Sequence, residues 1–357
     1  MTPDSEAQQT RTFASDPRAD QRLIQALSEF GMHEAQPVQA IKHTDSESAR
    51  LAWLIEAEKG FEALLAAQVM GLEPVREVDR EIQNIVGTDG TCIRLHVHSP
   101  RNPVEPARAV LHVHGGGMTM LSSTNPLYVY FRDAIASRGF TVVGVEFRNA
   151  AGNLGPHPFP AGLTDIYSSL NWLSSRPQGM EFESIVLVGE SGGANLAIAC
   201  GLLDAQRNSP RLVDGVYALC PMLVDARQPP DETIVSHTEN ADYFISKTIL
   251  QMCAASYDPV GVHRKNPLCW PLEASLDDLR ALPPHVISVN ELDPLRDEGL
   301  QFFERLVLAG VEARQRLVRG TCHAGDCNFP NATNDTFWTT ISDIVDFVQS
   351  LPSRAPI

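Results

Sequence analysis

The chain has 357 residues, of which 43% are hydrophobic and 20% are charged, as in an ordinary globular protein with a sizeable core. Its formal net charge of -16 disfavours nucleic acids and anionic membranes as partners, because both bind clusters of Lys and Arg. No apolar run approaches the roughly 18 residues of a membrane span, and no signal peptide is visible in the first twenty residues. The seven cysteines, an odd number without a Cys-x-x-Cys pair, indicate free thiols, so we expect a cytoplasmic protein.

The N-terminal pattern predicts a polar arm followed by helices. Residues 1–20 are mostly polar, which predicts a frayed arm. From residue 21 to Gly71 apolar side chains recur at spacings near three and four, the period of one helix face. Gly71 and Pro74 then favour a helix end, because glycine suits a C-terminal cap and proline cannot continue the helix.

From residue 75 onward, short apolar runs alternate with segments of helical length. This alternation predicts a mostly parallel β-sheet with helices on both faces, although the turn at 87–90 predicts an antiparallel pair for the first two strands. The expected strands are 75–82, 91–97, 109–114, 141–147, 184–188, 216–220, 286–290 and 313–318, and the expected helices are 125–137, 159–175, one after Ser191, 295–309 and 337–351. The arginines of 313–318 suit an exposed edge strand, through which two chains could pair as a homodimer.

One stretch, between Pro221 and Trp270, breaks the alternation and contains Pro229-Pro230. An insertion after a central strand lies above the carboxyl edge of a parallel sheet, where ligands bind. The expected division is therefore a cap of residues 1–74 and 222–265 over an α/β core of residues 75–221 and 266–357. A purely structural packing role for the insertion fits the pattern nearly as well.

The segment Gly189-Glu190-Ser191-Gly192-Gly193 stands between an apolar run and a small-residue helix. Strand, Gly-x-Ser-x-Gly and helix in that order predict a nucleophile elbow, a turn so sharp that the serine needs glycines on both sides. Such a turn exposes the Ser191 hydroxyl at the carboxyl edge of the sheet. The pattern is common by chance, and an incidental serine in a Gly-rich turn would look the same, so the hypothesis depends on its partners.

A serine nucleophile needs a base, and the base needs an acceptor that fixes its tautomer. Asp293 and His323 each follow the end of a predicted strand, so both are expected at the same sheet edge as Ser191. Each also has a simpler interpretation, Asp293 as a helix N-cap and His323 as a polar loop histidine. The nearby rivals for the acid are Glu291, Asp297 and Glu298.

Three glycines after the strand 109–114 predict an oxyanion hole. A tetrahedral intermediate carries charge on oxygen, and glycine lets peptide N–H groups approach that oxygen closely. We expect the amides of Gly116, Gly117 and Gly192 to be the donors, with His114 bracing the loop.

Two His-x-His pairs, at 96–98 and 112–114, offer a rival interpretation as a metal site. Alternate residues of a strand share one face, and two imidazoles there can bind zinc. No carboxylate with a matching role follows, and the second pair runs into the glycines. We therefore expect no metal and no other cofactor.

With these parts in place, the sequence resembles the hormone-sensitive-lipase-like esterases, the α/β-hydrolases with a His-Gly-Gly-Gly motif. The resemblance covers about residues 75 to 350 and rests on 114–117, 147–149, 157–160, 165, 189–193, 293–295 and 323. It implies an α/β-hydrolase fold with a mostly parallel eight-stranded sheet, a helical cap, no cofactor, and cleavage of short- to medium-chain esters. It also implies the same oxyanion hole as above.

The chain departs from this family beside the nucleophile. Family members usually have Asp or Thr before the serine and Ala after it, where this chain has Glu190 and Gly192. The additional glycine is expected to loosen one oxyanion donor. Arg148 and Asp165 are expected to form a structural charge pair.

We therefore predict a serine carboxylesterase that hydrolyses a small-molecule substrate, a short- to medium-chain or aryl carboxylic ester, through an acyl-enzyme intermediate. The alternatives are an amidase or carbamate hydrolase with the same triad, and a non-catalytic ligand receptor, which the complete triad argues against. The candidates for an apolar substrate pocket are Met118, Met120, Leu121 and Phe244, although ordinary core positions would look alike. The identity of the ester does not follow from the sequence.

Overall fold

The structure, a computed structural model, describes residues 11–34, 39–105, 107–175, 177, 180–207, 211–228 and 231–352. Its eight strands form one sheet in the order β1-β2-β4-β3-β5-β6-β7-β8. The strands are β1 (Val78–Val86), β2 (Cys92–Pro100), β3 (Arg108–Val113), β4 (Thr141–Glu146), β5 (Ser184–Glu190), β6 (Gly215–Leu219), β7 (His285–Asn290) and β8 (Ala313–Val318). Strand β2 runs antiparallel to β1 and β4, and the other neighbours are parallel. The predicted sheet is confirmed.

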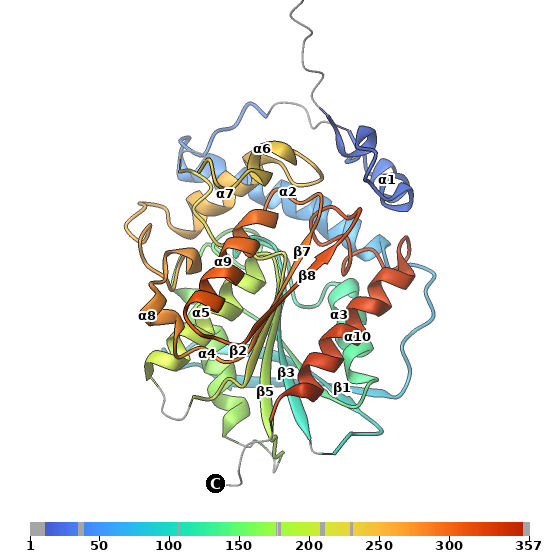
Figure 1. Ribbon diagram of the computed structural model, residues 1–357, viewed down its shortest axis with the longest axis vertical. Helices are drawn as coiled ribbons and strands as arrows, with labels where there is room; N and C mark the ends of the chain where they lie inside the picture. Colours follow the sequence, from blue (N-terminus) through green and yellow to red (C-terminus); the bar gives the residue numbers. More distant parts are fainter. Residues whose placement is uncertain are drawn as a thin grey trace, which may run out of the picture.

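Helices cover both faces of the sheet (Figure 1). Helices α3 (Pro126–Ala136) and α10 (Asn334–Ser350) lie on one face, and α4 (Ala161–Ser174), α5 (Gly192–Arg207) and α9 (Arg296–Leu308) lie on the other. The shorter or cap elements are η1 (Phe13–Ser15), α1 (Gln21–Ser28), α2 (Glu47–Ala67), α6 (Ser236–Glu239), α7 (Lys247–Tyr257), η3 (Pro271–Glu273) and α8 (Leu276–Leu279). Because strand side chains alternate, Val186 and Val188 of β5 join the core cluster under α3 and α10, whereas Ile185 and Leu187 join the larger cluster.

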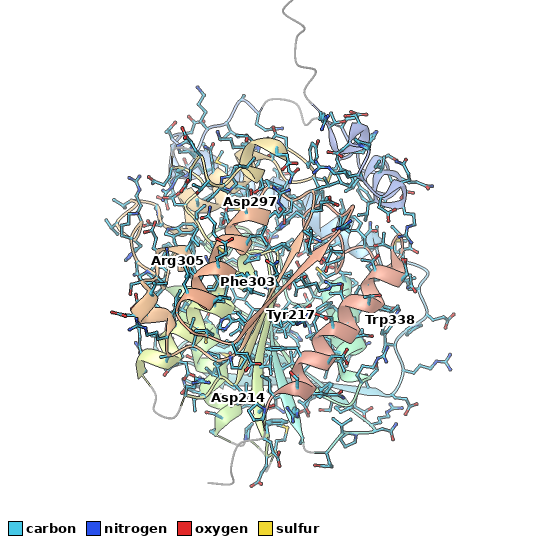
Figure 2. The ribbon with its side chains drawn as sticks, in the orientation of Figure 1. Asp214, Tyr217, Asp297, Phe303, Arg305 and Trp338 are labelled. Atoms are coloured by element: carbon cyan, nitrogen blue, oxygen red, sulfur yellow. The ribbon has the colours of Figure 1, made fainter. Side chains whose placement is uncertain are left out.

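Two buried polar contacts fix the core around the site. Tyr217 of β6, labelled in Figure 2, packs against Phe347 of α10 and donates its hydroxyl hydrogen to Asp343 at 2.6 Å. Arg148, just after β4, forms the predicted pair with Asp165 of α4 at 2.7 Å. Both contacts join a helix to the sheet, so the strand ends keep fixed positions.

The N-terminal segment is packed against the molecule where the structure describes it. Phe13 is only 1% exposed, and its ring lies edge-on to Tyr243 with centroids 6.1 Å apart. The prediction of a frayed arm is therefore wrong for residues 12–20, and residues 1–10 lie outside the described residues. The prediction failed because a lone apolar residue such as Phe13 produces no periodic pattern.

Helices α2, α6 and α7 lie beyond the end of the sheet where the parallel strands finish (Figure 1). This is the position expected for a cap, and α2 contacts α7. Pro229 and Pro230 lie outside the described residues, and the predicted domain limits stay a prediction. So do the cytoplasmic location and the homodimer, although β8 does form an edge of the sheet. Within the described ranges, every helix is too short or too polar to cross a membrane.

Candidate active site

Ser191 occupies the turn between β5 and α5 with φ of +56°, a left-handed conformation that costs a non-glycine residue about 1 kcal/mol or more. The glycines on either side make the turn possible: a Cβ on Gly189 would collide with the carbonyl of Gly193, and a Cβ on Gly193 with the carbonyl of Val113. The Ser191 amide donates to the carbonyl of Leu219, at the end of β6, at 2.9 Å. The strained turn is thus held by the neighbouring strands.

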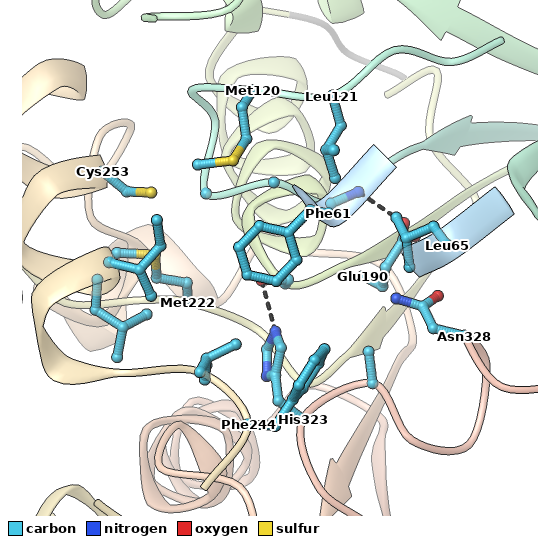
Figure 3. A pocket seen from close by; sticks show the side chains of 18 of the residues that line it. Phe61, Leu65, Met120, Leu121, Glu190, Met222, Phe244, Cys253, His323 and Asn328 are labelled. Atoms are coloured by element: carbon cyan, nitrogen blue, oxygen red, sulfur yellow. Dashed lines mark hydrogen bonds between the residues drawn. The ribbon is translucent and has the colours of Figure 1, made fainter. Parts of the chain in front are cut away.

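Ser191, His323 and Asp293 come together from the ends of β5, β8 and β7. His323 Nε2 lies 2.8 Å from the Ser191 hydroxyl oxygen, and His323 Nδ1 lies 2.8 Å from Asp293 Oδ2 (Figure 3 shows the first contact). Because a carboxylate only accepts, Nδ1 carries the hydrogen, which leaves Nε2 free to accept the serine proton. Asp293 is fully buried and His323 is 5% exposed, so water does not compete strongly for these contacts.

The carboxylate of Asp293 binds both His323 and the turn before α9, but it is not the helix N-cap, which is Leu295. Oδ1 accepts the Leu295 amide hydrogen at 2.8 Å, in the turn that leads into α9, while Oδ2 accepts from His323. The rival acids bind other groups: Glu291 the amide of Gly320, Asp297 the guanidinium of Arg296, and Glu298 the amide of Leu223. The structure therefore brings only Asp293, among these carboxylates, to His323.

The glycine loop after β3 lines the cavity beside Ser191. Gly116 and Gly117 have φ of +105° and +59°, which glycine adopts without strain. A Cβ on Gly116 would collide with the carbonyl of Met120, and one on Gly117 would lie 2.6 Å from Cys253 Sγ. Among the described residues, neither glycine's amide hydrogen meets an acceptor, so both can be donated to a substrate oxygen.

Gly192 brings the nucleophile turn into direct contact with this loop. A Cβ on Gly192 would lie 2.5 Å from the Met118 nitrogen and 2.7 Å from the Gly117 Cα atom. The loop therefore fills the space that a side chain would need. The expectation that the additional glycine loosens a donor stays a prediction, but the structure gives Gly192 another role, because only a residue without a side chain allows this close approach.

Glu190 supports the loop from behind, a role that its position in the motif did not reveal. Its Oε1 accepts the Gly115 amide hydrogen at 2.6 Å, and its Oε2 lies 3.2 Å from His112 Nε2. Both side chains are buried. Burial lowers the pKa of His112, so the neutral ring donates its Nε2 hydrogen to the carboxylate. The start of the glycine loop is thereby fixed to the residue before the nucleophile.

Three histidines of the two His-x-His pairs, His98, His112 and His114, have structural hydrogen-bond partners. His114 Nδ1 donates to the Gly115 carbonyl at 2.8 Å, its ring stacks on Phe147, and burial lowers its pKa to about 4. His98 Nδ1 lies 2.7 Å from the carboxylate of Asp133. In the described part of the chain, one group has the spacing of metal ligands, namely Cys220, Asp293 and His323. It contains two members of the triad, whose hydrogen bonds explain their proximity.

A cavity of about 70 Å³ lies in front of Ser191. Met120, Leu121 and Phe244 line it, as expected. The prediction for Met118 is wrong: Met118 is 2% exposed and belongs to the main core, because its backbone faces Gly192. Nine further residues, which no sequence motif assigns to a pocket, also line the cavity: Phe61, Leu65, Tyr128, Met222, Ile245, Ile249, Leu250, Cys253 and Asn328. Helical periodicity indicated that several of these face inward but gave no sign of what they face.

Comparisons with known proteins agree with this fold. Residues 110–325 match the family model described as alpha/beta hydrolase fold. The structure of brefeldin A esterase, described as a bacterial homologue of human hormone-sensitive lipase, is 34% identical and covers 96% of both chains with a TM-score of 0.89. The structure of esterase Est22 with p-nitrophenol is 33% identical and covers 95% of this chain and 100% of that chain, with a TM-score of 0.84.

A curated relative gives the same result from sequence. Esterase LipI of Mycobacterium tuberculosis is 30% identical over 254 residues, which are 69% of this chain and 75% of LipI. The family match covers more than half of the chain, and the likeness to brefeldin A esterase covers nearly all of it. The chain therefore belongs to the α/β-hydrolase family, among its hormone-sensitive-lipase-like esterases.

Proposed function

We propose that the protein is a carboxylesterase that hydrolyses short-acyl esters through an acyl-enzyme formed on Ser191. One observation carries the proposal: an unbroken hydrogen-bond chain runs from Ser191 through His323 to the buried Asp293. Beside Ser191 lies the loop 115–117, which lines the same cavity and in which the amides of Gly116 and Gly117 have no acceptor among the described residues. A nucleophile, a base, an orienting acid and an oxyanion hole are the parts that acyl transfer requires.

In the proposed reaction the Ser191 oxygen attacks the ester carbonyl while His323 Nε2 takes the serine proton. The amides of Gly116, Gly117 and Gly192 donate to the oxygen of the tetrahedral intermediate. His323 then gives its proton to the departing alcohol oxygen, which leaves the acyl group on Ser191. A water molecule attacks the acyl-enzyme with His323 again as base, and the free acid departs.

The size of the cavity supports a short acyl group. Its volume of about 70 Å³ is far below the roughly 300–1,000 Å³ of sites for drug-sized ligands. Its walls are mainly apolar, so an alkyl or small aryl group fits better than a charged one. The structure of esterase Est22 with p-nitrophenol supports the use of p-nitrophenyl esters as first substrates.

The test is Ser191→Ala with p-nitrophenyl acetate. We expect kcat to fall by up to about a million-fold, because the nucleophile is lost while the fold stays. Ser350→Ala, at the exposed end of α10, is the matched control and should keep full activity. A fluorophosphonate should label the native protein on Ser191. Activity retained by a pure Ser191→Ala preparation would contradict the mechanism, and comparable rates on the matched anilide would favour an amidase.

A further inference from the structure

Helix α6 and the residue that follows it bind the loop that carries the acid of the triad. Asn240, directly after α6, donates its side-chain amide hydrogens to the backbone carbonyls of Glu291 and Asp293, at 3.1 and 3.0 Å. Asn240 is fully buried, so water does not compete strongly for these two hydrogen bonds. One side chain thus fixes the backbone at Asp293 itself and two residues before it.

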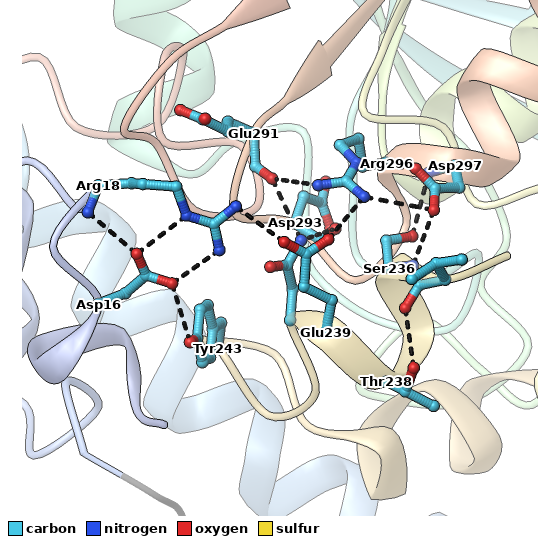
Figure 4. Close-up of polar contacts among 12 residues, drawn as sticks. Asp16, Arg18, Ser236, Thr238, Glu239, Tyr243, Glu291, Asp293, Arg296 and Asp297 are labelled. Carbon is cyan, nitrogen blue, oxygen red and sulfur yellow. Dashed lines mark hydrogen bonds and ion pairs between the residues drawn. The ribbon is translucent and has the colours of Figure 1, made fainter. Parts of the chain in front are cut away.

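The other end of α6 binds the same loop (Figure 4 shows Ser236 and Asp297). Ser236 donates its hydroxyl hydrogen to the carbonyl of Pro294 at 2.7 Å, and the Asp297 amide donates to the Ser236 hydroxyl oxygen at 3.1 Å. The Ser236 amide in turn donates to the Asp297 carboxylate at 2.8 Å. Helix α6 therefore holds the loop on both sides of Asp293, with Ser236 at the later residues and Asn240 at the earlier ones.

The opposite side of the loop binds the segment that leads to the triad histidine. The Leu292 amide donates to the carbonyl of Thr321 at 3.0 Å, two residues before His323. Arg296 also donates to the two carbonyls that Asn240 binds, but it does so from within the same stretch of chain. The loop is thus held between two other elements, and Asn240 supplies its backbone contact on the α6 side.

The oxygen of the Asn240 amide indicates that stability alone does not explain this residue. Oδ1 is buried and has no hydrogen-bond partner in the described part of the chain. A buried acceptor without a partner destabilises a fold, because it has lost its hydrogen bonds to water. A role in placing Asp293 explains why an asparagine occupies this position despite that loss.

Resting on the proposed function, we propose that Asn240 is a positioning residue for the reaction. Through the two carbonyls it keeps the Asp293 carboxylate 2.8 Å from His323 Nδ1, where the carboxylate orients the ring. Asn240 is not among the described residues that line the cavity, so it does not touch the substrate. Since misplacement of a catalytic group by about 1 Å can lower a rate about 10²-fold, loss of the two hydrogen bonds should lower kcat and leave KM nearly unchanged.

The test replaces Asn240 by leucine, which has the same branched outline but no hydrogen to donate. Asp204→Leu is the matched control. Asp204 is fully buried and accepts the amide hydrogens of Leu212 and Val213 at 2.7 and 2.9 Å, just before β6 and thus at the opposite edge of the sheet from Ser191. Both variants therefore lose two hydrogen bonds between a buried side chain and the backbone. Asn240→Ala, whose smaller side chain needs no additional space, repeats the test if the leucine variant does not fold.

With p-nitrophenyl acetate, Asn240→Leu should lower kcat about ten-fold or more and change KM less than about two-fold, whereas Asp204→Leu should keep both within about two-fold of the native values. Proton NMR gives a second readout. The Nδ1 hydrogen of His323, held by Asp293, should give a far-downfield signal in the native protein, which His323→Gln identifies by removing it. We expect this signal to weaken or vanish in Asn240→Leu, because water reaches a displaced hydrogen bond, and to persist in Asp204→Leu.

An unchanged kcat with an unchanged NMR signal in Asn240→Leu, or equal losses in Asp204→Leu, would overturn the positioning role and leave the esterase proposal intact. A rise in KM at constant kcat would also overturn it, because Asn240 would then act on substrate binding. No hydrolysis of p-nitrophenyl acetate by the native protein, together with no fluorophosphonate labelling of Ser191, would instead overturn the proposed function. The NMR signal would then still show whether Asn240 positions Asp293.

Discussion

The floor and the roof of the cavity are built by different means. The floor consists mainly of the segments after β3, β5, β6 and β8, and the roof consists of α2 and residues 244–253. In the floor, hydrogen bonds and left-handed turns fix atoms such as Ser191 Oγ and His323 Nε2. The roof is instead held by the packing of apolar side chains such as Phe61 and Leu250 against the main core. Reacting atoms need positions fixed to fractions of an ångström, whereas an apolar wall can accept several shapes.

An ionic cluster joins the N-terminal segment and α6 to the loop after β7 (Figure 4). Arg18, in the N-terminal segment, pairs with Asp16 at 2.7 Å and with Glu239 of α6 at 2.8 Å. Glu239 also pairs with Arg296 at 2.9 Å, three residues after Asp293. The N-terminal segment is thereby linked through the cap to the loop that carries the acid of the triad. The predictions below separate the two regions by their effects on rate and on stability.

The largest effect is expected in the floor, from Gly192→Ala. The new methyl group would collide with the Met118 nitrogen and the Gly117 Cα atom, which forces the oxyanion loop away from Ser191. Loss of one correctly placed donor lowers kcat by about 10² to 10³. Steady-state kinetics on p-nitrophenyl acetate measure the change. Gly201→Ala in the same helix is the control, because its Cβ would meet only ordinary contacts at 3.6 and 3.7 Å. Unaltered kcat in Gly192→Ala would show that the oxyanion loop can accommodate the methyl group without displacing its donors.

A smaller effect on rate is expected from substitution of Glu190, which positions the glycine loop through Gly115 without touching the reacting atoms. Glu190→Ala leaves the buried Gly115 amide without its acceptor, a loss of about 1–3 kcal/mol. We expect kcat to fall about ten-fold with KM nearly constant. Glu190→Gln keeps an oxygen for Gly115 and can donate to the other tautomer of His112, so it should stay within about three-fold of the native rate. Equal losses in both variants would show that the negative charge, not the hydrogen bond, is what matters.

The floor was largely predictable from sequence because each of its parts is local. A strand end followed by a glycine, an acid or a histidine identified Ser191, Asp293, His323 and the oxyanion loop without reference to contacts. The roof was not predictable from sequence. Phe61 and Phe244 are in contact although more than 180 residues separate them in the chain, and helical periodicity does not indicate which residues pack against each other. Glu190 is an intermediate case. Its position looked unusual, but Gly115, whose amide hydrogen it accepts, lies 75 residues away.

The smallest effect on rate and a clear effect on stability are expected from Asp16→Asn in the ionic cluster. Asp16 is 1% exposed, and hydrogen bonds from Arg18, against the opposing effect of burial, lower its pKa from 3.8 to about 2. A carboxyl group whose pKa is lower in the folded state stabilises that state above the unfolded pKa, and this stabilisation is lost as pH falls toward the folded pKa. The shift corresponds to about 2 kcal/mol of unfolding free energy at pH 7.

Urea unfolding of the native protein and of Asp16→Asn should therefore differ by about 2 kcal/mol from pH 7 down to about pH 4, and the difference should shrink between about pH 4 and pH 2. The rate on p-nitrophenyl acetate should change less than about three-fold, because no floor hydrogen bond includes Asp16 in the described structure. Asp335→Asn, which removes a surface partner of Arg22, is the control and should have a much smaller effect on stability. A stability difference that persists unchanged to pH 2 would mean that the packing of the N-terminal segment, rather than the Asp16 charge, holds this segment against the protein.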